Sequence, residues 1–233
     1  MNDNQLSKRL ETAASYIKKG ARLADIGSDH AYLPCHLAQK EQVSFAIAGE
    51  VVIGPYASAK KQIKESNVQA VVEARLGDGL AVIEKSDAID TITICGMGGD
   101  LIARILDAGK EDNRLETVER LILQPNNGEK KLRQWLFDNN YGIISEEILK
   151  ENDKIYEIIV AEPSDDISAY TEDDFTFGKQ LRQEKGPVFV EKWQREYDKY
   201  TYILNSLNES QRDVSEKKKT VEAFMTKIQE EIA

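Results

Sequence analysis

Arg22-Leu-Ala-Asp25-Ile-Gly27-Ser-Asp29-His30-Ala31-Tyr32-Leu33, near the N-terminus, is the stretch that decides the fold. The apolar run up to Ile26 predicts a short buried strand, Gly27 predicts a tight turn, and the residues from about Ala31 predict a helix. A strand, a glycine turn and a helix in this order bind nucleotide-type cofactors in doubly wound α/β domains. The stretch therefore predicts such a domain, with its cofactor at this turn.

Strands and helices alternate on both sides of this turn. An amphipathic helix is predicted at 5–17, and strands at 22–26, 44–50, 71–76, 91–95 and 120–124. Helices are predicted between the strands, at 31–41, 55–66, 100–108 and 128–139. This alternation predicts a mostly parallel sheet with helices on both faces.

The pattern changes after Asn140. Residues 141–149 and 154–162 both have the character of strands, and only a short polar turn separates them, so we expect a hairpin. A parallel sheet closed by one antiparallel hairpin fits the class I methyltransferase sheet better than a symmetric dinucleotide-binding fold. The predicted fold class is therefore a doubly wound α/β methyltransferase sheet.

The C-terminal part has a different character. Residues 163–174 are polar and acidic and indicate a linker. Beyond it, apolar residues recur at spacings of four and three, at Trp193, Tyr197, Tyr200, Leu204 and Leu207, and again at Val214, Val221, Phe224, Met225, Ile228 and Ile232. Two such helices predict an antiparallel, coiled-coil-like hairpin joined around 208–210. We expect a cofactor-binding domain at 1–162 and a helical arm at 163–233, which is either a solvated hairpin or an arm that grips a substrate or dimerises.

Composition limits the function classes. The net charge of −10 argues against a protein that coats nucleic acid indiscriminately, although local basic patches remain compatible with it. No apolar run approaches the ~18 residues of a membrane span, and no signal segment is recognisable, so we expect a cytoplasmic protein without membrane association. Cys35 and Cys95 lie in apolar runs and are expected to be reduced thiols. We expect a monomer.

The residues of the turn favour one cofactor. A dinucleotide-binding turn usually has three glycines, whereas this one has Gly27 alone and the acidic Asp29 at its centre. A carboxylate there would repel a pyrophosphate, but it suits the ammonium and sulfonium charges of S-adenosylmethionine. Glu50 ends the second strand and can accept hydrogen bonds from ribose hydroxyls, and Asp78 follows the third and can bind the adenine amino group. We expect the three strand ends to form one crevice.

Two further strand ends carry candidate chemistry. The fourth strand runs into Cys95-Gly96-Met97-Gly98-Gly99, where the glycines predict a close approach to a ligand or a turn with positive φ. Leu123-Gln-Pro-Asn-Asn127 ends the fifth strand, and its two asparagine amides either frame a base edge or form an ordinary turn. His30, Cys35 and His36 are not completed by further ligands, so we expect no metal.

Several strings are unusual in combination, namely Leu6-Ser-Lys-Arg9-Leu10, Gly27-Ser-Asp-His-Ala-Tyr-Leu33, Ala48-Gly-Glu-Val51, Gly54-Pro-Tyr56, Cys95-Gly-Met-Gly-Gly99 and Leu123-Gln-Pro-Asn-Asn127. On these strings the chain resembles the bacterial tRNA adenine-22 N1-methyltransferases. The resemblance implies transfer of a methyl group from S-adenosylmethionine to N1 of an adenine in tRNA, with the helical pair helping to hold the RNA. Two positions depart from the family pattern, Asp100 where a basic residue is frequent and Asp78 where Asn is common.

The site candidates follow from the strand ends and the resemblance together. The cofactor-binding candidates are Arg9, Asp25, Gly27, Ser28, His30, Tyr32, Glu50, Val51, Gly77, Asp78, Gly79 and Cys95. The catalytic candidates are Asp29, Gly96, Met97, Gly98 and Asn126. Adenine N1 carries a free lone pair at neutral pH, so the reaction requires in-line placement rather than a strong base. An acceptor aimed at the adenine N6 amino group, from Asp29, the 96–98 backbone or Asn126, would stabilise the developing charge.

Other functions remain open on the residues alone. The acidic charge slightly favours a class I methyltransferase acting on a small molecule or a protein, and a non-catalytic S-adenosylmethionine-binding protein that interacts with RNA is a third possibility. We expect local basic clusters to contact the tRNA phosphates. For each cluster, the alternative is an ordinary solvated surface. These clusters are Lys8-Arg9, Lys18-Lys19 with Arg22, Lys60-Lys61, Lys130-Lys131 with Arg133, and Lys217-Lys218-Lys219.

Overall fold

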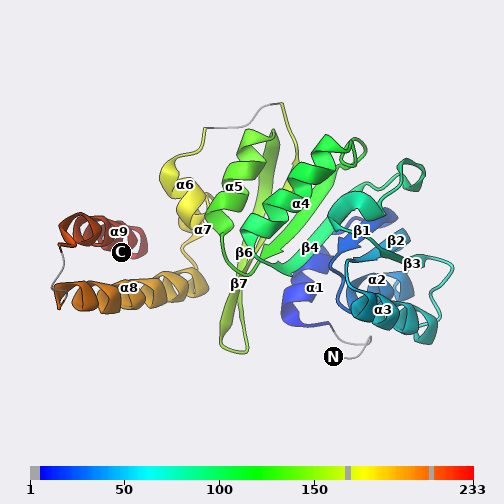
Figure 1. Ribbon diagram of the computed structural model, residues 1–233, viewed down its shortest axis with the longest axis horizontal. Coiled ribbons are helices and arrows are strands. Elements are labelled where there is room, and N and C mark those ends of the chain that lie inside the picture. Colours follow the sequence, from blue (N-terminus) through cyan, green and yellow to red (C-terminus); the bar gives the residue numbers. More distant parts are fainter. Residues whose placement is uncertain (1–5, 166–168, 210–212) are drawn as a thin grey trace. The chain divides into compact units, whose positions relative to one another are not determined.

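The computed structural model describes residues 6–165, 169–209 and 213–233, and the chain forms two compact units, Met1–Gly178 and Lys179–Ala233 (Figure 1). In the described residues, the first unit contains a seven-stranded sheet in the order β3-β2-β1-β4-β5-β7-β6. The parallel strands are β1 (Ala21–Ile26), β2 (Val43–Glu50), β3 (Val72–Leu76), β4 (Thr91–Met97) and β5 (Arg120–Pro125). The hairpin strands are β6 (Tyr141–Glu151) and β7 (Lys154–Pro163).

The predicted parallel sheet with one antiparallel hairpin is confirmed. β7 runs antiparallel to β5, with Leu123 opposite Ile159. The strand order reverses between β1 and β4, which lie side by side at the middle of the sheet. In open α/β sheets, ligands bind beside the carboxyl ends of the strands at such a reversal. The fold therefore directs attention to the loops that follow β1 and β4.

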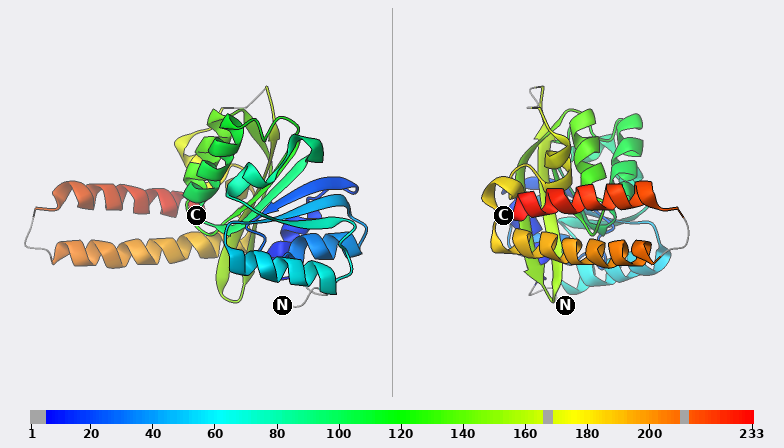
Figure 2. Two further views of the ribbon diagram at one scale, coloured as in Figure 1. Left: turned by 45° about the vertical axis from the view of Figure 1, so that its right-hand side comes forward. Right: turned by 90° about the vertical axis from the view of Figure 1, so that its left-hand side faces the viewer.

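Helices cover both faces of the sheet, and each face has its own apolar core (Figure 2). One face carries α1 (Lys8–Ser15), α2 (Tyr32–Gln39) and α3 (Ile53–Glu65). The other carries α4 (Gly99–Glu111), α5 (Glu129–Asp138) and the 3-10 helix η1 (Gly79–Val82), which η2 (Lys85–Asp87) follows. Successive residues of β1 alternate between the two cores, because strand side chains point to opposite faces: Leu23 enters the first core and Ala24 the second.

The first unit extends past the expected end of the cofactor-binding domain at Glu162. It includes α6 (Glu172–Phe177), which packs on α5 through aromatic rings. The Phe175 ring lies 5.5 Å from that of Phe137 and 5.3 Å from that of Tyr170, measured between centroids. These rings give a stretch with linker-like composition a hydrophobic anchor on the sheet unit.

The second unit contains α7 (Leu181–Glu184), α8 (Pro187–Asn208) and α9 (Ser215–Ile232). The predicted helical hairpin is confirmed, although residue 210 of the expected join lies outside the described residues. The rings of Tyr200 and Phe224 pack edge to face between α8 and α9, with centroids 4.9 Å apart. None of the helices in the described ranges is long and apolar enough to cross a membrane.

Arg133 is a buried charge inside the first unit. The sequence grouped it with Lys130 and Lys131 as a surface cluster, but the Arg133 side chain is 0% exposed. Its Nε donates to Glu146 at 2.6 Å and its Nη2 to Glu157 at 2.5 Å. Burial alone would lower the pKa of Arg133, but the two carboxylates outweigh it and raise that pKa. The expected phosphate contact is therefore wrong for Arg133, because a tertiary ion triad holds this side chain inside the protein.

Candidate active site

The loop after β1 has an unusual backbone. Gly27 has a φ of +68°, and the three successive residues Asp29, His30 and Ala31 have φ values of +43°, +71° and +57°. Each left-handed residue other than glycine costs roughly 1–3 kcal/mol and persists only where surrounding contacts impose it. Here, the Gly27 N–H donates to the Gly49 carbonyl at 2.9 Å, and the Asp29 N–H to Glu50 Oε1 at 2.6 Å. The end of β2 therefore holds the loop in its strained conformation.

Two buried carboxylates lie at this loop. Asp25 is 3% exposed, and it accepts hydrogen bonds from the hydroxyls of Ser28 at 2.5 Å and Thr93 at 2.6 Å. Burial raises the pKa of Asp25, although the two hydroxyls lower it in part. Burial likewise raises the pKa of Glu50, against the effect of the Asp29 N–H. Burial penalises the ionised form of both groups, and a cationic ligand would relieve that penalty.

The loops after β4 and β5 are joined by an amide network. The Gly96 N–H donates to Gln124 Oε1 at 3.0 Å, and Arg9 Nη1 of α1 donates to the same oxygen at 2.6 Å. Asn126 Nδ2 donates to the Gly96 carbonyl at 2.7 Å, and the Asn126 N–H donates to the Met97 carbonyl at 2.7 Å. The strand-end residues that the sequence singled out therefore hold one another in place.

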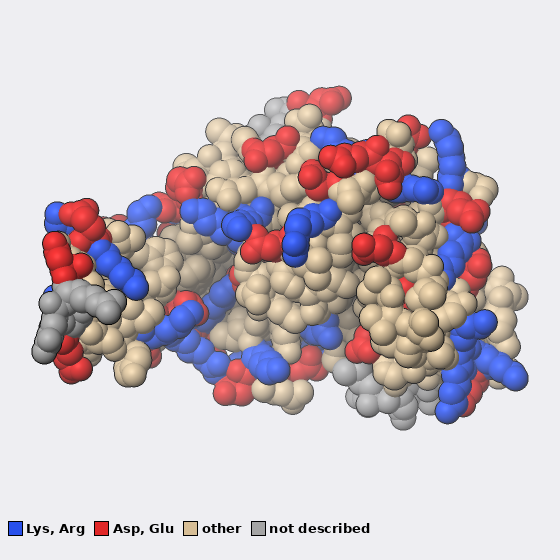
Figure 3. All heavy atoms as spheres, in the orientation of Figure 1, with Lys and Arg blue, Asp and Glu red and all other residues tan. Residues whose placement is uncertain are grey.

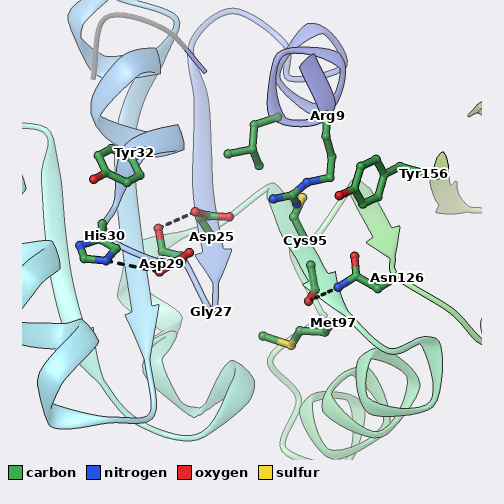
Figure 4. A pocket seen from close by; sticks show the side chains of 13 residues that line it. Arg9, Asp25, Gly27, Asp29, His30, Tyr32, Cys95, Met97, Asn126 and Tyr156 are labelled. Carbon is green, nitrogen blue, oxygen red and sulfur yellow. Dashed lines mark hydrogen bonds and ion pairs between the residues drawn. The ribbon is translucent and has the colours of Figure 1, made fainter. Parts of the chain in front are cut away.

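These loops surround a cavity of about 540 Å³ (Figure 4). Its size falls in the range of small-molecule sites. The predicted residues that line it are Arg9, Asp25, Gly27, Ser28, Asp29, His30, Tyr32, Cys95, Gly96, Met97 and Asn126. The structure thus brings together most of the cofactor-binding and catalytic candidates. Burial raises the pKa of the Cys95 thiol to about 12, so this group is neutral at physiological pH.

The remaining candidates, Glu50 among them, do not line this cavity, so the three strand ends expected to share one crevice do not all border it. Asp78 and Gly79 line a second cavity of about 390 Å³, between η1 and α4. Val51 follows Glu50 with 63% of its surface exposed. Gly77 packs against Val82, where an added Cβ would lie 2.9 Å from a methyl group. Gly98 is the N-cap of α4.

Leu10 and Tyr156 also line the larger cavity, although neither was among the site candidates from the sequence. Tyr156 lies on β7 and faces Arg9, whose guanidinium carbon is 5.5 Å from the ring centroid. Its neighbour Glu157 points to the opposite face, toward Arg133. The alternation of strand side chains carries the signal for Tyr156, but only once the hairpin is known to border the site.

Gly99 allows the β4 and β5 loops to approach each other. Its N–H donates to the Asn127 carbonyl at 2.7 Å, and a Cβ on Gly99 would lie 2.3 Å from the Gly128 carbonyl oxygen. We expect Gly99→Ala to lower the free energy of unfolding by about 1–3 kcal/mol in urea titrations, because backbone has to move. Gly54→Ala is the control, since a Cβ there meets nothing within 4 Å in helix α3, and its stability should hold or rise. Equal effects of the two substitutions would refute the steric argument.

Comparisons with known proteins agree with this site. The profile described as "TrmK: tRNA (adenine(22)-N(1))-methyltransferase" matches residues 23–231. A Bacillus subtilis tRNA (adenine(22)-N(1))-methyltransferase is 46% identical over 226 residues, covering 95% of this chain and 94% of the relative.

Solved structures give the same answer. A Streptococcus pneumoniae putative tRNA (m1A22) methyltransferase in complex with S-adenosyl-L-methionine is 44% identical, with a TM-score of 0.90 over 98% of this chain and 100% of that one. M. capricolum TrmK, in complex with the natural cofactor product S-adenosyl-homocysteine, is 28% identical, with a TM-score of 0.86 over 97% of each chain. The chain therefore belongs to the tRNA (adenine(22)-N(1))-methyltransferase family, and it is an S-adenosylmethionine-dependent enzyme that methylates N1 of adenine 22 in tRNA.

Proposed function

We propose that S-adenosylmethionine binds at the side of the cavity formed by the ends of β1 and β2, and that the target adenine enters at the side formed by β5 and β7. The observation that carries this division is the uneven distribution of charge. Asp25 and Asp29 lie on the β1–β2 side, where Glu50 accepts from the Asp29 N–H (Figure 4). On the other side, the side chains of Asn126 and Tyr156 are uncharged amide and phenol groups, and the charged side chain beside them, Arg9, is a cation.

The residues present fit the cofactor. Two buried carboxylates with raised pKa values suit the ammonium and sulfonium charges. Among the described residues that line the larger cavity, Arg9 carries the one permanent positive charge, which matches the single carboxylate of the methionine part. Glu50 Oε2 is left to accept from ribose hydroxyls while Oε1 holds the loop. Asp78, Gly79 and the exposed Val51 would hold the adenine, and Ser28, Gly77 and Cys95 would shape the walls.

His30 and Tyr32 would form the rim of the cofactor half. Their rings are stacked, with centroids 5.5 Å apart, and His30 is about half exposed. This stacked pair lies beside Asp29, with His30 Nε2 3.6 Å from Asp29 Oδ1. We infer that it screens the bound cofactor from water.

The chemistry requires placement more than proton transfer. When bound, S-adenosylmethionine supplies an electrophilic methyl group on a positively charged sulfur. Adenine N1 has a lone pair and needs no prior deprotonation. The Cys95 thiol is neutral, and N1 carries no proton that it would have to remove. The strained loop, the Gly96 backbone, Met97 and Gly98 would fix donor and acceptor in line, which can supply up to roughly 7–11 kcal/mol.

The position of each candidate separates their roles. Asp29 has an 87% exposed carboxylate, and its N–H donates to Glu50 Oε1, which supports a role on the cofactor side. Asn126 lies across the cavity, next to Gly96. We therefore propose that Asp29 acts on the cofactor and Asn126 on the base.

Adenine N1 is hidden in a paired helix, so the base has to leave its stack before transfer. We infer that the α8–α9 hairpin helps to hold the RNA, with Lys217, Lys218 and Lys219 as phosphate contacts, of which Lys219 also pairs with Glu216 at 2.9 Å. Basic and acidic side chains alternate on the face drawn in Figure 3. Lys130 pairs with Glu172 and Lys131 with Asp100, both at 2.7 Å, so these lysines are partly neutralised. We also propose that the enzyme is a cytoplasmic monomer.

Asp29→Asn tests the division of the cavity. Asparagine tolerates the positive φ of this position, so the substitution removes charge without adding strain. We expect binding of S-adenosylmethionine to weaken up to about fivefold, a limit set by exposure of the carboxylate, with a smaller change for S-adenosylhomocysteine, which keeps the ammonium group but lacks the sulfonium charge. Calorimetric titration gives both constants, and nucleoside analysis gives 1-methyladenosine formed on unmodified tRNA. Normal turnover together with unchanged affinity for both ligands would reject a role for Asp29.

A further inference from the structure

Gln124 is a fully buried amide with one possible orientation. Its Oε1 accepts from Arg9 Nη1 at 2.6 Å and from the Gly96 N–H at 3.0 Å, and its Nε2 donates to the Pro125 carbonyl at 2.8 Å. The first two partners can only donate and the third can only accept. A flipped amide would lose all three bonds, so the orientation of Gln124 is fixed.

Gln124 in turn fixes Asn126. Gln124 Nε2 also donates to Asn126 Oδ1 at 3.2 Å, while Asn126 Nδ2 donates to the Gly96 carbonyl at 2.7 Å. Asn126 therefore keeps one lone pair on Oδ1 and one N–H on Nδ2 for a ligand. Its side chain is exposed and lines the cavity (Figure 4).

One acceptor beside one donor matches one edge of adenine. An asparagine amide binds the N6 amino group and N7 of adenine together, accepting from the first and donating to the second. N7 and N1 lie on opposite sides of N6, so this contact leaves the N1 lone pair free to attack the methyl group. Guanine has the acceptor O6 in place of the N6 amino group. Two acceptors, O6 and Asn126 Oδ1, would then face each other without a hydrogen bond.

The Tyr156 ring is a flat surface on the same side of the cavity as Asn126. Leu123 of β5 pairs with Ile159 of β7, and the same antiparallel register carried three residues further places Tyr156 level with Asn126. The Arg9 guanidinium lies over the Tyr156 ring at 5.5 Å. Bases taken out of a helix stack on aromatic rings, so the Tyr156 ring is the surface offered to the base.

We propose that Asn126, oriented by Gln124, recognises N6 and N7 of the target adenine beside the Tyr156 ring, and so directs N1 to the methyl group. This proposal rests on the proposed function, because it assumes that the β5–β7 side of the cavity receives the base. Asn126 touches the substrate, whereas Gln124 is a positioning residue.

The test combines an atom change in the RNA with a change in the enzyme. Wild type and Asn126→Ala are each assayed on tRNA carrying adenosine or 7-deazaadenosine, which lacks N7, at position 22. We expect wild type to lose roughly tenfold in kcat/KM on the deaza substrate. Asn126→Ala should lose roughly tenfold on adenosine and nothing more on the deaza substrate. Equal penalties for the deaza substrate in both enzymes, or none in wild type, would overturn the proposal.

Two further variants separate recognition from folding. Asn127→Ala changes the neighbouring amide, which does not line the described cavity, and should keep the wild-type ratio between the two substrates. Gln124→Glu keeps an acceptor for Arg9 and Gly96 but places a second acceptor against Asn126 Oδ1, so that ratio should approach one. S-adenosylhomocysteine affinity, measured by calorimetry, should stay within about threefold of wild type for Asn126→Ala.

The outcomes also distinguish this proposal from the proposed function. If the wild-type enzyme is active and the loss of N7 does not lower its kcat/KM, only the recognition of the base by Asn126 is rejected, and the proposed function stands. Loss of S-adenosylhomocysteine binding in Asn126→Ala would instead place Asn126 in the cofactor half and reject the division of the cavity. A Gln124→Glu enzyme that keeps the wild-type ratio would reject its positioning role.

Discussion

Arg133→Met is expected to lower the free energy of unfolding by about 3–5 kcal/mol, the usual cost of removing one partner from a buried ion pair. Methionine fills most of the same volume, so the loss comes from electrostatics rather than from a cavity. The substitution leaves Glu146 and Glu157 buried without their shared cation, and these side chains are 0% and 1% exposed. It also removes the donor to the Phe175 carbonyl that ties α5 to α6.

Thermal and urea unfolding followed by circular dichroism measure this effect. A loss of this size in a domain of 150–250 residues corresponds to a Tm lower by roughly 6–20 °C. The matched control adds Glu146→Gln and Glu157→Gln to Arg133→Met, which removes all three charges and should recover most of the stability. If the single variant lost less than about 1 kcal/mol, the triad would not be an important support of the fold.

Arg133 also shows why the prediction of a surface position was wrong. Residues 129–138 contain Leu132 and Leu136, and helical spacing places position 133 close to the same buried stripe. The apolar pattern thus carried a signal, but the charge of the side chain argued for the surface. The arginine can be buried because the fold brings two acids of the hairpin, Glu146 and Glu157, next to it, and neither acid is near it in sequence.

Local rules were sufficient for the sheet and for most of the cavity. Strand period, glycine turns and the short polar turn at 150–153 act over a few residues, and acids at the ends of parallel strands converge by topology. The conformation of Asp29, His30 and Ala31 depends instead on a hydrogen bond to Glu50, so no local preference predicts it. Tyr156 was missed for a related reason, because strand alternation identifies it only once the antiparallel hairpin is known to border the site.

Glu50→Gln is expected to weaken S-adenosylhomocysteine binding by about 10- to 100-fold, the range for hydrogen bonds to a charged group. The glutamine oxygen can still accept the Asp29 N–H, so the loop conformation should survive. The glutamine NH2 group cannot accept from a ribose hydroxyl, whereas the second carboxylate oxygen of Glu50 can. The loss therefore reports on the cofactor contact itself rather than on the loop. Glu65→Gln, an exposed position on α3 paired only with Lys61 in the described contacts, is the control and should bind as wild type.

The same substitution should act on stability in the opposite direction. The folded-state pKa of Glu50 is raised, chiefly by burial, so the empty protein binds its proton more readily than the unfolded chain does. The penalty for the ionised group is absent below the unfolded pKa, grows as pH rises through the folded pKa and is complete above it. Glu50→Gln removes this penalty, so the empty variant should melt at or above the wild-type temperature at pH 7, and the difference should shrink as pH falls.

Melting curves between pH 4 and pH 8, with and without S-adenosylhomocysteine, measure both effects in one experiment. Wild type should gain more from the ligand than Glu50→Gln does at pH 7, and this advantage should decline as protonation neutralises Glu50. A variant that binds within twofold of wild type would show that the ribose does not depend on this carboxylate. A variant that binds weakly and also melts earlier without ligand would show that Glu50 acts by supporting the loop, since relief of a buried charge cannot destabilise the empty fold.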